Sequence, residues 1–127
     1  MAIIEGTRTE KQWSGKYDFA VDGGAVSTIT LRSNDGPIPN GSVITGGYVD
    51  VTSSVLSATG TIALNSEGAG DIVAAVGQAS WTAGRKSIVP AGTGVTAVKS
   101  TAARAPAMTI ATAVFTAGAF ELVLNYR

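Results

Sequence analysis

The chain has 127 residues, a formal net charge of zero, and neither histidine nor cysteine. These absences exclude Ser-His and Cys-His nucleophile pairs, disulfides, and zinc sites built from His or Cys. The nine basic and nine acidic residues are dispersed without the basic stripe that phosphate binding requires, so we expect no nucleic-acid partner.

The length fits a single domain, and the composition predicts a thin core. Hydrophobic residues make up 45% of the chain but aromatic residues only 6%, and alanine buries little area per residue. We therefore expect oligomerisation or docking on a larger body to add stability. The polar opening segment and the lack of a long apolar run predict no signal peptide and no membrane partner.

Residues 1–15 are expected to form an extended arm that precedes a single domain over residues 16–127. This arm contains four charged residues and two glycines, and Trp13 is the large side chain of its polar part. Two interpretations stay open. The arm is either a frayed terminus with Trp13 folded back on the body, or a strap that becomes ordered on a partner.

Alternating apolar and polar residues predict strands over 16–22 and 25–32, and Gly23-Gly24 between them predicts a hairpin turn. The following stretch, 33–41, is dense in turn-forming residues and prolines, so we expect a surface loop.

A third strand is predicted over 43–52, where Gly46-Gly47 is a pair that permits a bulge. A short strand follows at 59–64. Residues 71–76 are expected to form one or two helical turns, because their apolar spacing is helical and Asp71 could cap the helix.

Residues 77–106 are expected to hold two short strands. The final hairpin is expected to pair 108–115 with 120–126 across a turn at 116–118. Many short strands and almost no helix predict an all-β fold, a two-sheet sandwich of jelly-roll or Greek-key type with at most one short helix.

Paired carboxylates are the catalytic device that remains without histidine. We interpret the acidic residues of the predicted strands as solvated surface groups, so we expect no enzyme activity. The glycine-rich loop 65–71 superficially resembles a calcium loop but lacks the EF-hand register and its late Glu. We expect no metal and no cofactor. The acidic residues that are candidates for a catalytic carboxylate pair are Asp18, Asp22, Asp50, Glu67, Asp71 and Glu121.

Trp81, Arg85 and Lys86 could mark an oligomer or surface-binding site, because Trp and Arg are frequent at interface hot spots. A core Trp81 beside a solvated Arg85-Lys86 tip is an equally good interpretation.

Four strand-and-turn phrases of the sequence carry a family resemblance: Ile38–Val51, Thr61–Leu64, Asp71–Ala75 and Thr116–Tyr126. They resemble phrases of small head decoration, or cement, proteins of tailed bacteriophages. As a pattern, the resemblance covers Tyr17 to Arg127.

The resemblance implies a jelly-roll-like domain on the exterior of the virion capsid, made in the host cytoplasm. Its implied partners are the major capsid protein and further copies of itself, with a trimer favoured. Two parts of the chain are the candidate capsid contacts. They are Arg8, Lys11 and Trp13 in the arm, and Pro37, Ile38, Pro39 and Asn40 in the following loop.

The alternative function is a carbohydrate-binding or host-attachment β-module of a phage fibre or tail. Such modules present exposed aromatic side chains on one face for stacking against sugars.

Overall fold

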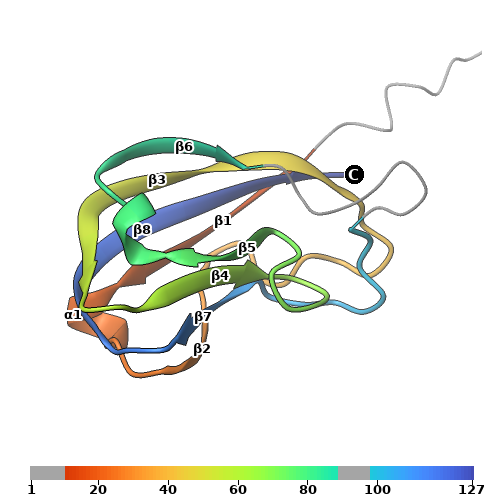
Figure 1. Cartoon of the computed structure of the whole chain (residues 1–127). Coiled ribbons are helices and arrows are strands. Elements are labelled where there is room, and N and C mark those ends of the chain that lie inside the picture. Colours follow the sequence, from red (N-terminus) through yellow and green to blue (C-terminus); the bar gives the residue numbers. More distant parts are fainter. Residues whose placement is uncertain (1–10, 89–97) are drawn as a thin grey trace, which may run out of the picture.

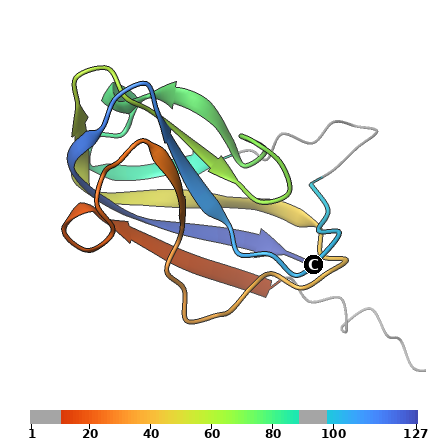
Figure 2. The same cartoon turned by 90° about the horizontal axis from the view of Figure 1, so that it is seen from below.

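The computed structural model describes residues 11–88 and 98–127, which form two antiparallel sheets stacked face to face (Figures 1 and 2). Each sheet has four strands within the described residues. Sheet A has the order β1 (Lys11–Asp18), β8 (Phe115–Tyr126), β3 (Ile44–Ser57), β6 (Gly84–Ile88). Sheet B has the order β2 (Ser27–Thr30), β7 (Ala107–Ala111), β4 (Thr61–Asn65), β5 (Val73–Gly77).

The chain crosses repeatedly between the sheets, so that most consecutive strands lie in opposite layers. β1 pairs with β8, the last strand, and β2 pairs with β7. This nesting of early and late strands in two four-stranded sheets is the jelly-roll arrangement. It confirms the expected all-β sandwich. Helix in the described residues is limited to α1 (Phe19–Asp22) and the 3-10 turn η2 (Gln78–Ser80), and no described helix has the length and apolarity needed to cross a membrane.

The core lies between the sheets and is richer in aromatic contacts than the composition suggested. Trp13, Tyr17 and Phe115 are among its largest fully buried side chains. The Phe120 ring lies with its centroid 5.5 Å from Tyr17 and 5.1 Å from Trp81. Aromatic rings from β1, β8 and the turn after η2 therefore meet in the centre of the sandwich.

The expected hairpin over residues 16–32 is wrong. Asp18 caps α1 by accepting a hydrogen bond from Ala20 N at 3.0 Å, and this helix turns the chain out of sheet A. Gly23, with φ 77°, ends the helix. The next strand, β2, then enters sheet B, and a single bridge between Lys16 and Arg32 is what remains of the predicted pairing.

The expected terminal hairpin is also wrong. β7 ends at Ala111, and the turn to the other sheet centres on Thr112, whose φ of 74° closes a γ-turn from Ala113 N to Ala111 O at 2.9 Å. Residues 116–118 are not a turn but part of β8. A Cβ on Gly118 would lie 2.9 Å from a methyl carbon of Val55, so this glycine allows β3 and β8 to cross closely.

Two further boundaries differ from expectation. Residues 73–77 form the strand β5 and not a helix, because Val73 and Val76 pair with β4 and pack against the core. Lys11–Gly15, expected in the arm, belong to β1. The bulge permitted at Gly46-Gly47 lies one residue earlier: the register shifts between Ile44 and Gly46, whereas Gly46 and Gly47 pair in regular register with β8.

Trp13 anchors the edge strand β1. The side chain is 1% exposed, and its indole Nε1 donates a hydrogen bond to Gly36 O at 2.7 Å. A Cβ on Gly15 would lie 2.3 Å from the indole ring, so the ring occupies the space that a glycine leaves open.

We predict that Trp13→Ala lowers the free energy of unfolding by about 3–5 kcal/mol, the usual cost of emptying such a buried site. Trp13→Phe should lose less, because it retains a buried ring and loses mainly the hydrogen bond to Gly36. Urea denaturation measures both, with the exposed neighbour variant Gln12→Ala as control. A Trp13→Ala loss no larger than that of Gln12→Ala would contradict the assignment.

Candidate interaction surfaces

Residues 35–43, 65–72 and 98–106 gather at the end of the sandwich where β1 begins and β8 ends (Figure 1), and we call this the loop end. Strand-like backbone bonds hold it together. Ile38 and Arg104 exchange hydrogen bonds of 2.8 and 3.0 Å, and Ser100 N donates to Ser42 O at 2.7 Å. The loops therefore form an ordered platform beyond the sheets.

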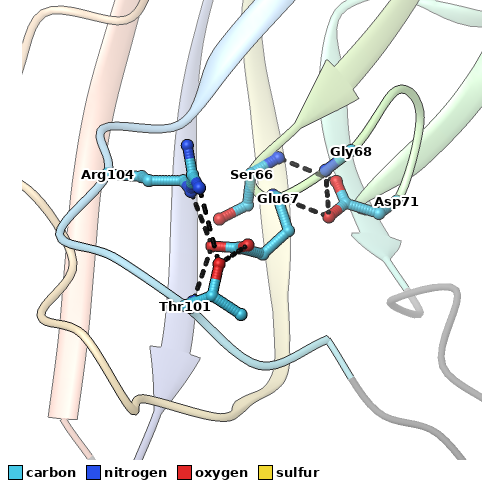
Figure 3. A network of polar contacts seen from close by, with 6 residues as sticks. All are labelled: Ser66, Glu67, Gly68, Asp71, Thr101 and Arg104. Carbon is cyan, nitrogen blue, oxygen red and sulfur yellow. Dashed lines mark hydrogen bonds and ion pairs between the residues drawn. The ribbon is translucent and has the colours of Figure 1, made fainter.

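Glu67 ties two of these loops together (Figure 3). Its carboxylate accepts hydrogen bonds from Thr101 Oγ1 at 2.8 Å, from Thr101 N at 3.1 Å and from Arg104 Nε at 2.9 Å. These contacts, led by the Thr101 hydroxyl, lower the pKa of Glu67, although partial burial opposes them. Glu67 thus pins the β4–β5 loop to the segment that leads into β7.

Asp71 closes the β4–β5 loop on itself. Its carboxylate accepts backbone hydrogen bonds from Ser66 at 2.7 Å, Glu67 at 2.8 Å and Gly68 at 3.0 Å (Figure 3). The loop that resembled a calcium site in sequence is therefore closed by the carboxylate of Asp71, whose oxygens accept hydrogen bonds from the preceding backbone N–H groups. Within the described ranges no group of three or more acidic side chains is placed to hold a metal ion.

Two of the acidic candidates, Asp50 and Glu121, belong to a charge row across the outer face of sheet A. Register places Lys16, Glu121, Asp50 and Arg85 side by side on β1, β8, β3 and β6. Asp50 and Glu121 are thus neighbours, but they lie on an open face between two cations. This arrangement fits the solvated-face interpretation better than a catalytic carboxylate pair.

The two sheets differ sharply in charge. Every Lys, Arg, Asp and Glu that lies in a described strand belongs to sheet A, and the strands of sheet B contain none. The exposed face of sheet B is built from Ala, Thr and Asn. This difference in charge could not be predicted from the sequence, because it depends on which strands share a sheet.

The structure divides the predicted capsid-contact residues between surface and core. Pro37, Pro39 and Asn40 are exposed at the loop end, and Lys11 is exposed at the start of β1. Two hydrophobic members are buried, Trp13 at 1% exposure and Ile38 at 0%, so a partner cannot touch their side chains. Arg8 lies outside the described residues.

The second predicted group is divided in the same way. Trp81 is 4% exposed and packs on Phe120, which favours the core interpretation. Arg85 is exposed, with its guanidinium carbon 4.2 Å from the centroid of the Tyr48 ring. Lys86 borders an apolar groove of about 180 Å³ between the edge strands β5 and β6, whose floor includes Trp81.

Comparison with solved structures finds the same fold in bacteriophage capsids. A chain in the acid-stable capsid structure of Helicobacter pylori bacteriophage KHP30 aligns over 92% of this chain and 86% of its own length, with a TM-score of 0.61 and 11% identity. A chain in the capsid asymmetric unit of cyanophage Pam1 aligns over 92% and 83%, with a TM-score of 0.60 and 19% identity. No family model and no curated protein sequence gives a match. The resemblance therefore rests on shape.

We predict that Glu67→Gln weakens the acid dependence of stability. Because the folded pKa of Glu67 is lowered, its stabilising effect is complete above the ordinary value of about 4.5 and is lost as pH falls through the folded pKa. The variant lacks this component, so its unfolding midpoint should fall less than that of the wild type on acidification.

Urea midpoints measured between neutral and acidic pH test this prediction. Arg104→Gln is the matched control: it removes one partner and leaves both Thr101 hydrogen bonds, so an intermediate dependence is expected. A Glu67→Gln profile parallel to the wild type would show that the network does not act as described.

Proposed function

We propose that this protein is a structural component of a tailed-bacteriophage head, a decoration protein that binds the outer surface of the mature capsid and bridges major capsid subunits. The observation that carries the proposal is the jelly-roll fold shared with chains of two phage capsids over 92% of this chain. The sequence resemblance to cement proteins points the same way. The described residues also form a bonded loop platform at one end of the sandwich, which is available for contact with a larger body.

Stabilisation would follow from mass action. A protein that binds the mature lattice and not its disassembled subunits stabilises each site by RT ln(1 + [L]/Kd), about 2.7 kcal/mol at a hundredfold excess over Kd. Many such sites would together oppose the pressure of packaged DNA. No cofactor takes part, and the binding surface alone performs the function.

The loop end is the surface we propose for the capsid contact. Pro37, Pro39 and Asn40 project there from a backbone already fixed by the Ile38–Arg104 bonds. Because the loop is ordered before binding, less conformational entropy is lost on association. Lys11 at the start of β1 lies at the same end of the sandwich, and Arg8 precedes it in the chain.

The alternative, a sugar-binding attachment module, is less well supported by the surface. The described residues include every aromatic residue of the chain, and none of these side chains is exposed. The Tyr48 ring is half-buried and covered by Arg85. A platform for stacking against sugars is therefore missing from the described surface.

Co-sedimentation with expanded, undecorated heads of the parent phage tests the function directly. We expect saturable binding at a fixed number of copies per major capsid subunit, counted by mass spectrometry. The loop variant P39E/N40E should lower the affinity at least tenfold, whereas Ser87→Glu on β6 should bind as the wild type. No binding by the wild type, together with a few copies in the tail, would favour the attachment module.

Residues 1–10 can be tested separately because β1 begins at Lys11. Deletion of residues 1–10 leaves Trp13 in place, whereas deletion of 1–15 would remove most of an edge strand. We predict that the shorter deletion reduces head binding and changes the free energy of unfolding by less than about 0.5 kcal/mol. Unchanged head occupancy would exclude Arg8 as a contact.

A further inference from the structure

The outer face of sheet B carries an open hollow of about 260 Å³ at its β4–β5 edge. Alanine side chains dominate its lining, and no charged residue takes part. The hollow, here called the alanine hollow, is lined by Ala63, Asn65, Ala69, Gly70, Ala74, Ala75 and Thr109.

The polar groups of the alanine hollow are already bonded to one another. Asn65 Nδ2 donates to Thr109 Oγ1 at 2.8 Å, and Asn65 Oδ1 accepts from Gly70 N at 2.6 Å. Thr109 Oγ1 also lies 3.1 Å from Thr28 Oγ1. A ligand therefore has little to gain from hydrogen bonding here. An aliphatic side chain suits this uncharged hollow, because it buries apolar area and leaves no polar group of its own unpaired.

The same chain exposes large aliphatic side chains at its other end. Val21, Val26, Leu56 and Val114 are 66%, 53%, 54% and 54% exposed, and they are the large hydrophobic residues that the described structure leaves exposed. Val21 lies in α1, Leu56 is the penultimate residue of β3, and Val26 and Val114 directly precede β2 and β8. These element ends meet at the α1 end of the sandwich, opposite the loop end (Figure 1). We call this group the apolar end.

Leu56 and Val114 lie on adjacent segments of the apolar end. Ser57 Oγ donates to Val114 O at 2.8 Å, and Thr116 Oγ1 donates to Leu56 O at 3.3 Å. These bonds fix the backbone that carries both side chains. Exposed aliphatic groups on a fixed backbone are a feature of protein interfaces.

We propose that the alanine hollow of one copy receives the apolar end of a second copy, with Leu56 and Val114 as the inserted side chains. The two surfaces belong to different parts of the molecule, so the contact is heterologous and repetition around an axis would close a ring. This inference deepens the oligomer expected under the proposed function, but it concerns contacts between copies and needs no capsid.

Charge argues against the other large face as the contact between copies. The row Lys16, Glu121, Asp50, Arg85 reads basic, acidic, acidic, basic from either edge of sheet A. A face-to-face two-fold pairing centred on this row would oppose like charges, which is unfavourable. The uncharged face of sheet B carries no such penalty.

Sedimentation of the free protein is the first test. Wild type should form a defined oligomer at about 100 µM, and Ala75→Glu should sediment as a monomer with unchanged circular dichroism. Ala75→Leu, which fills the hollow without adding charge, should also sediment as a monomer. Ser87→Glu, the matched change on the exposed edge of sheet A, should keep the oligomer. A monomeric wild type would overturn the inference.

The absence of cysteine from the chain allows a sharper test of which surfaces meet. Leu56→Cys and Ala75→Cys are prepared separately, mixed and treated with a short bismaleimide. A heterologous contact predicts covalent dimers that contain one copy of each variant, identified by mass spectrometry. Ser87→Cys mixed with Ala75→Cys should give none. Cross-linking of Leu56→Cys alone, without mixed dimers, would instead indicate that apolar ends meet each other.

The two proposals can fail separately. An oligomer that forms as described but does not sediment with heads would remove the decoration function and leave the contact between copies intact. Head binding by a wild type that is monomeric in solution would remove the contact between copies and leave the decoration function intact.

Discussion

The sandwich depends on β8, which lies inside sheet A and pairs along its length with both β1 and β3. Its inward residues Phe120, Leu122 and Leu124 are each at most 2% exposed, and they form the inner surface on which sheet B packs. Without β8, neither β1 nor most of β3 would have a hydrogen-bonding partner in sheet A. The first strand, β1, thus forms its backbone hydrogen bonds with the last strand, β8. This pairing makes nearly the whole chain one cooperative unit, and closing so long a loop costs conformational entropy during folding.

This long-range pairing explains which parts of the fold the sequence could predict. Alternation of apolar and polar residues located most strands, because side-chain direction is a local property of the backbone. Pairing is not local. Gly23-Gly24 and Gly118 both look like hairpin turns in the sequence, yet Gly23 ends a helix and Gly118 permits a close crossing with Val55. Residues 71–76 had helical spacing, but residues 73–77 form a strand because pairing with the edge of β4 satisfies their backbone hydrogen bonds.

Functional surfaces were harder to predict than strands for the same reason. Glu67 and Arg104 are 37 residues apart, so their ion pair could not be inferred from spacing. Trp13 lay among charged residues, so the sequence left open whether its ring folds back on the body or contacts a partner. The ring is buried, because the glycine two positions later leaves room for it in the core. The exposed loop Pro37–Asn40 was identifiable, because prolines and turn residues exclude a central strand whatever the fold. Its fixed conformation, which depends on Arg104, was not.

The distribution of charge suggests how a small sandwich could serve two kinds of contact at once. Charged strands on sheet A keep that face hydrated and discourage association through it, since desolvating those groups would cost more than their mutual attraction returns. Association is then directed to the surfaces that remain, which are the bonded loops at one end, the aliphatic side chains at the other and the uncharged face of sheet B. The loops and the apolar end lie at opposite ends of the strands. A protomer could therefore insert its apolar end into a neighbouring copy while Pro37, Pro39 and Asn40 contact a shell, because none of these three loop residues lines the alanine hollow or belongs to the apolar end.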